Sequence, residues 1–157
     1  MEENKIINDI DLKNNVLEYY NNNKNIFSPI LGDVKLTPQW LRHLDNKDKK
    51  HKRTPDETKI RYKSFLFIDE IIKKSHLYQE YKQEIQDVEI KKNGKKIKVS
   101  KKVKYFGLIW IIEAYQWHRI RLKVVLKKVW NRKIEFVSVV PARNMKWYHR
   151  LYFDEQI

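Results

Sequence analysis

The sequence contains no cysteine and only three glycines. It also lacks any run approaching the ~20 uninterrupted apolar residues of a membrane span. The missing thiols exclude disulfides, thiolate nucleophiles and cysteine zinc sites, and they are compatible with a reducing cytoplasm. Gly32, Gly94 and Gly107 are scattered, so there is no glycine-rich loop for nucleotide phosphates, and the usual nucleotide-binding folds are excluded. The acidic start of the chain argues against a secretory signal.

Metal ligands are also missing from the sequence. The five histidines do not stand at metal-ligand spacings, and no carboxylate cluster accompanies them. We therefore expect no metal and no cofactor. Metal-free cleavage of RNA stays possible, because the ribose 2′-hydroxyl is an internal nucleophile that needs only an acid, a base and a cation near the phosphate.

Charge is abundant and unevenly distributed. Residues 1–50 hold eight basic and eight acidic residues, so the whole net charge of +14 lies in residues 51–157. A segregated positive field favours a polyanion as partner, either nucleic acid or an anionic surface. The alternative is a merely solubilising charge in a lysine-rich proteome.

The pattern of the chain predicts helices first and strands afterwards. We interpret the Asn-rich residues 1–25 as a lead-in or linker with a possible helix, followed by one domain over residues 26–157. Thr37 and Pro38 are favourable for a helix start, and residues 55–74 fit a helix or a broken helix pair.

Apolar residues then alternate with a period of two. "DVEIKKNGKKIKV" predicts a hairpin with an Asn-Gly turn, whose "KKNGKK" tip should protrude as a basic arm. "VKYFGLIWIIEAY", "RIRLKVVLKKVW" and "KIEFVSVVP" predict further strands. The expected fold class is α+β, with N-terminal helices packed on an antiparallel sheet of about four strands.

Four cations share one face of a predicted strand, namely Arg119, Arg121, Lys123 and Lys127. Alternate residues of a strand point the same way, and phosphates are the natural partners of such a row. Trp117 and His118 precede the row, and aromatic rings can stack on unpaired bases. The alternative is the solvated outer face of a sheet. The expected nucleic-acid-binding residues are Arg119, Arg121, Lys127, Trp117 and His118.

One histidine stands at a noticeable place. In "TPQWLRHL", His43 lies on the flank of a helix whose inner face carries Trp40, Leu41 and Leu44. A histidine titrates near neutral pH and suits acid–base catalysis. A packing role is the alternative, and the residues alone do not decide between them.

The order of these segments resembles a known superfamily. "VKLTPQWLRHL", "FLFIDEIIKKS", "YFGLIWIIE", "IRLKVVLKKV" and "IEFVSVVPAR" are similar to the phage-borne nucleases of the barnase–EndoU–colicin–RelE-like (BECR) superfamily. The match covers roughly residues 30–143. It implies a metal-independent RNase fold with His43 as acid or base, Ser138 and Arg143 near the scissile phosphate, and Lys123 as a phosphate contact on the preceding strand.

Two functional hypotheses follow. The first is an endoribonuclease that cleaves host RNA, such as tRNA or mRNA, in the bacterial cytoplasm, delivered as part of a phage particle. The second is a non-catalytic nucleic-acid-binding module that uses the same basic sheet face. A phage structural protein or an inhibitor protein is a possible further partner, and no membrane partner is expected.

Overall fold

The computed structural model describes residues 9–40, 42, 55–113 and 119–142. Helices and short strands come first in the chain, and long strands follow. In chain order, the elements are α1 (Asp9–Asn22), β1 (Asn25–Ser28), β2 (Gly32–Lys35), α3 (Pro55–Phe65), α4 (Ile68–Lys74), β3 (Glu80–Lys92), β4 (Lys95–Glu113), β5 (Arg119–Val129) and β6 (Ile134–Ala142).

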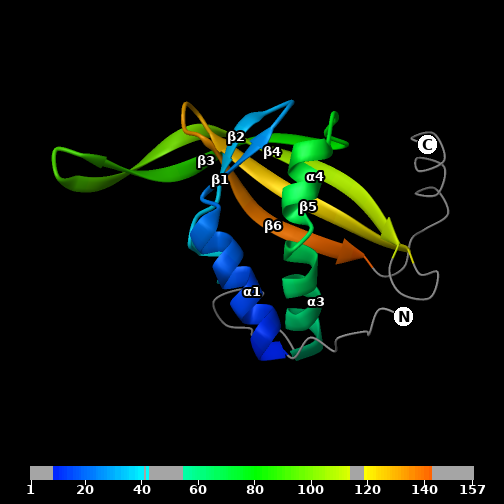
Figure 1. The fold of residues 1–157 in the computed structure, drawn as a ribbon. Helices are drawn as coiled ribbons and strands as arrows, with labels where there is room; N and C mark the ends of the chain where they lie inside the picture. Colours follow the sequence, from blue (N-terminus) through cyan, green and yellow to red (C-terminus); the bar gives the residue numbers. More distant parts are fainter. Residues whose placement is uncertain (1–8, 41, 43–54, 114–118, 143–157) are drawn as a thin grey trace, which may run out of the picture.

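The described strands form one sheet in the order β1-β2-β6-β5-β4-β3 (Figure 1). All neighbouring strands are antiparallel except β2 and β6, which run parallel and pair Val34 with Ile134. The α+β class is therefore confirmed, but the expected sheet of about four antiparallel strands was wrong. Over the described residues, the sheet is mixed and has six strands.

The two unforeseen strands are four-residue segments on either side of "PIL". Their hairpin pairs Ser28 with Gly32, and Gly32 adopts a φ of 81°, a left-handed conformation that glycine enters without strain. Four residues are too few to show a convincing alternation in the sequence. What holds this hairpin in the sheet is pairing with β6, about a hundred residues later.

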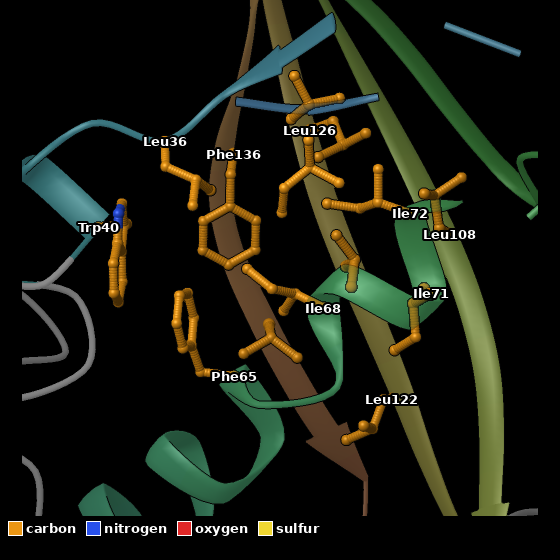
Figure 2. Close-up of a cluster of buried hydrophobic side chains, with 14 of the residues drawn as sticks. Leu36, Trp40, Phe65, Ile68, Ile71, Ile72, Leu108, Leu122, Leu126 and Phe136 are labelled. Atoms are coloured by element: carbon orange, nitrogen blue, oxygen red, sulfur yellow. The ribbon is translucent and has the colours of Figure 1, made fainter. Parts of the chain in front are cut away.

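The helices pack on one face of the sheet and enclose the core (Figure 2). Trp40 stacks on Phe65, with ring centroids 4.0 Å apart, and both rings meet Phe136 of β6 edge-on. Ile68, Ile71 and Ile72 of α4 are fully buried in the same cluster. The expected broken helix pair over residues 55–74 is thus confirmed, with the break after Phe65.

Helix α1 belongs to this core although it lies within the Asn-rich start. Its Leu12 and Val16 are buried, and the Tyr19 hydroxyl donates a hydrogen bond to Asp69 of α4. Burial raises the pKa of Tyr19 above its ordinary value, and the neighbouring Asp69 carboxylate raises it further. The apolar positions of α1 therefore attach it to the domain.

The predicted Asn-Gly hairpin is confirmed. Val88 pairs with Val99 and Ile90 with Ile97, around a turn in which Asn93 and Gly94 both have positive φ. Strand β4 continues without a break into the sheet. Among the described strands, residues 85–102 pair only with one another, so this arm extends beyond the helices (Figure 1).

Candidate nucleic-acid interface

The two faces of β5 differ as the alternation predicted. Leu122, Val124 and Leu126 are buried under the helices. Arg121 and Lys123 lie on the opposite face, which we call the far face, together with Lys127. Their side chains are partly exposed there. The far face therefore carries Arg121, Lys123 and Lys127 of the predicted basic row.

A carboxylate from the edge strand neutralises part of this row. Glu80 of β3 places its Oε2 atom 3.0 Å from Nζ of Lys123, and its Oε1 atom 3.6 Å from a guanidinium nitrogen of Arg121. Strand β4 runs between β3 and β5, so the Glu80 side chain must cross over it. It does so at Gly107, its direct cross-strand partner.

Gly107 is what permits this crossing. A Cβ atom built on Gly107 would lie 2.9 Å from Cβ of Glu80 and 3.2 Å from Oε2 of the same side chain. Any other residue would compete with Glu80 for the space. Because Gly107 has no side chain, the carboxylate of Glu80 on β3 reaches Lys123 and Arg121 on β5, two strands away.

An open hollow of about 650 Å³ adjoins this ion pair. Its lining includes Glu80 and Lys123 together with Lys82, Glu84 and Tyr105. A space of this size falls within the range of small-molecule sites. It offers an arriving ligand carboxylates, ammonium groups and an aromatic ring on one surface.

Polar contacts hold in place the side of the hollow that Lys82, Glu84 and Tyr105 form. Nζ of Lys82 lies 2.9 Å from Oε2 of Glu84, and Gln86 donates hydrogen bonds to Glu84 and to the hydroxyl of Tyr105. The bond to Lys82 lowers the pKa of Glu84, with a second contribution from Gln86, and the same bond raises the pKa of Lys82. Lys127 extends over the Tyr105 ring.

The structure brings some of the predicted site residues together. Ser138 of β6 pairs with Val125 and so shares the far face with Lys123, Arg121 and Lys127. The backbone of Arg119 pairs with Glu113, but its side chain lies outside the described residues. Four predicted residues fall wholly outside the described ranges, namely His43, Arg143, Trp117 and His118.

The position of Trp40 bears on the expected role of the helix histidine. Trp40 lies in the core beneath the helix-covered face of the sheet, whereas Lys123 lies on the far face. Trp40 and Lys123 thus lie on opposite faces of the sheet, and His43 itself is outside the described residues.

Sequence reasoning missed Glu80. It is one of several carboxylates on its strand, followed by Glu84, Asp87 and Glu89, and nothing in the sequence distinguishes it from them. The sequence does contain one clue, a glycine in the middle of the apolar strand "YFGLIW". A glycine inside a strand often marks the close approach of another group.

Metal-site geometry, the character of the helices and similarity to known proteins assign no further role to the described residues. Within the described ranges, no group of three or more His, Asp or Glu residues is placed to hold a metal ion. None of the described helices combines the length and apolar character of a membrane-crossing segment. No family model matches the chain, and no curated protein or solved structure matches it either.

Proposed function

We propose that this chain is a metal-independent endoribonuclease that cleaves host RNA by acid–base catalysis at the far face of its sheet. One observation carries the proposal. The Glu80 carboxylate lies beside Lys123 and Arg121 at the edge of an open hollow. A proton acceptor next to two cations supplies two of the three groups that metal-free phosphodiester cleavage requires, the base and the cation near the phosphate.

The proposed reaction uses the RNA's own hydroxyl. Glu80 accepts the proton of the ribose 2′-hydroxyl as its oxygen forms a bond to phosphorus. The bond from phosphorus to the 5′-oxygen breaks, and that oxygen leaves with a proton from an acid. Lys123 and Arg121 exchange their ion pairs with Glu80 for contacts to the phosphate, whose negative charge grows in the transition state.

The remaining roles come from the resemblance to BECR nucleases. His43 is the proposed acid, Ser138 hydrogen-bonds to the phosphate, and Arg143 binds it. The same resemblance supports a phage- or mobile-element-encoded enzyme acting on tRNA or mRNA in the host cytoplasm. An inhibitor protein or a phage structural protein is the proposed protein partner.

A second candidate function is a nucleic-acid-binding module without catalysis. The ion pairs themselves favour it, because Lys123 and Arg121 are already paired with Glu80. In that case Glu80 is a structural counterion, and phosphates bind to cations elsewhere on the chain.

Cleavage of RNA in the presence of a chelator tests the proposal. We expect the protein to cut RNA in EDTA and to leave 2′,3′-cyclic phosphate ends, while the same sequence made of 2′-deoxynucleotides stays intact. His43→Ala should lower the cleavage rate by about 10²–10⁴-fold with an unchanged melting temperature. Binding of RNA without any cleavage would instead establish the second candidate.

Gly107→Ala tests how Glu80 is positioned. The added methyl group collides with Glu80 and should push its carboxylate away from Lys123. A displacement of about 1 Å in a reacting group can cost about 10²-fold in rate. We expect a kcat/KM loss of that order with RNA binding retained. Because both changes act on one group, adding Glu80→Gln should lower the rate no further than Glu80→Gln alone, and additive losses would contradict this.

A further inference from the structure

Within the described ranges, a row of lysines lies on the opposite face of the sheet from Glu80. Alternate residues of a strand share a face, and β4 carries lysines at four such positions on the helix side. Strand β5 adds a fifth directly opposite the last of them. We call this set the lysine stripe; it consists of Lys96, Lys98, Lys102, Lys104 and Lys128.

Carboxylates of the described residues leave this stripe largely uncompensated. Lys96 has such a partner, with Nζ 3.3 Å from a carboxylate oxygen of Glu89. The other four form no ion pair with any carboxylate in the described ranges. Lys104 and Lys128 even stand directly opposite each other, an arrangement that destabilises a sheet. On the far face, Lys82 and Lys123 each have a carboxylate partner, and Lys101 and Lys127 lie over the rings of Trp130 and Tyr105.

Exposed aromatic rings mark the inner end of the stripe. Phe106 follows Lys104 on the same face of β4, and Tyr81 of β3 is its cross-strand partner. Tyr78 packs edge-on against Phe106, with centroids 5.1 Å apart. Both tyrosines are close to half exposed, at 45% and 49%. Such rings offer faces on which unpaired bases can stack.

We propose that the lysine stripe, with Tyr78 and Tyr81, binds a single-stranded segment of nucleic acid. The lysines contact successive phosphates along the arm, and the tyrosines stack on bases where the arm joins the domain. A narrow row, with four lysines on β4 and one on β5, favours a linear polyanion over a membrane, which would meet a broad basic surface. The rings favour unpaired bases over a duplex, whose bases are already stacked.

This inference deepens the proposed function and rests on it for the identity of the polymer as RNA. Glu80 and Tyr81 are neighbours on the edge strand β3, and their side chains point to opposite faces. A strand that passes around this edge can therefore occupy the stripe and the hollow together. The substrate class is an RNA with an unpaired segment flanking the cleavage site.

Binding of a 12-nucleotide single-stranded DNA, measured by fluorescence anisotropy over a range of salt concentrations, tests the stripe. This probe lacks the 2′-hydroxyl, so binding is observed whether or not the chain cleaves RNA. We expect the triple variant Lys98→Gln, Lys102→Gln, Lys104→Gln to bind more weakly. The slope of log affinity against log salt should fall by about 2, from about 0.7 per lost contact.

A matched triple variant separates the stripe from overall charge. Lys13→Gln, Lys35→Gln, Lys63→Gln removes the same charge from exposed positions on α1, β2 and α3, and it should keep nearly the parent slope. Equal slopes for the two triple variants would overturn the proposal. So would tighter binding to vesicles of anionic phospholipid than to the oligonucleotide.

A second pair of variants tests base stacking. Tyr81→Leu keeps an apolar side chain but removes the ring, and it should weaken single-strand binding about tenfold. Tyr81→Phe keeps the ring and should bind as the parent does. Equal affinity for duplex and single strand, or equal binding by both variants, would overturn the single-strand assignment. These binding measurements do not depend on whether the protein cleaves RNA in EDTA. The proposal on the lysine stripe and the proposal of an endoribonuclease can therefore fail separately.

Discussion

Replacing Glu80 by glutamine should lower kcat/KM for RNA cleavage by about 10²–10⁴-fold, the usual contribution of a general base. Glutamine keeps the size of the side chain and its place over Gly107, but it cannot accept the proton of the 2′-hydroxyl. It also releases Lys123 and Arg121 from their carboxylate partner. We therefore expect affinity for uncleavable 2′-deoxy oligonucleotides to stay the same or rise while the rate falls.

Glu70→Gln is a suitable control for this experiment. Glu70 is an exposed glutamate on α4, where it is paired with Lys74 at 2.9 Å. Breaking an exposed i,i+4 pair costs only a few tenths of a kcal/mol, so rate and melting temperature should stay near parent values. A Glu80→Gln enzyme that cuts RNA at the parent rate would remove Glu80 from the mechanism and leave it as a counterion.

The largest effect on stability should come from Phe65→Ala. Phe65 is fully buried, stacks on Trp40 and meets Phe136 edge-on. Its removal leaves a cavity between α3 and the sheet, and the free energy of unfolding should drop by about 3–5 kcal/mol. Urea denaturation followed by tryptophan fluorescence measures the change.

Phe27→Ala provides the matched comparison. Phe27 is the same residue type, but its side chain is 62% exposed on β1. Its removal should change the free energy of unfolding by no more than about 0.5 kcal/mol. Similar losses at both positions would mean that the aromatic stack is not the centre of the core.

Local patterns predicted those parts of the fold that local interactions determine. The Asn-Gly turn set the hairpin register of Val88 and Val99, and the strict alternation of β5 set which of its residues are buried. The short strands β1 and β2 could not be found in this way. They are sheet members because Val34 lies beside Ile134, and no window of sequence contains both.

The candidate site was predictable only where it lay on one strand. Arg121, Lys123 and Lys127 were placed on a common face because a period of two requires it. The partner of two of them was not foreseen, since the meeting of Glu80 with β5 depends on the register of two hairpins and on a gap above Gly107. The lysine stripe was also missed, because the sequence does not show which lysines retain a carboxylate neighbour.

The place of β6 between β2 and β5 has a consequence for synthesis on the ribosome. Strand β6 spans Ile134–Ala142, so the first hairpin and α1 are made long before the strand that joins them to the sheet. Until β6 leaves the exit tunnel, β2 and β5 each present an unpaired edge, which is a site for mispairing with other chains. We therefore expect nascent chains stalled before Ile134 to need chaperone protection, and release of β6 to be the step that closes the sheet.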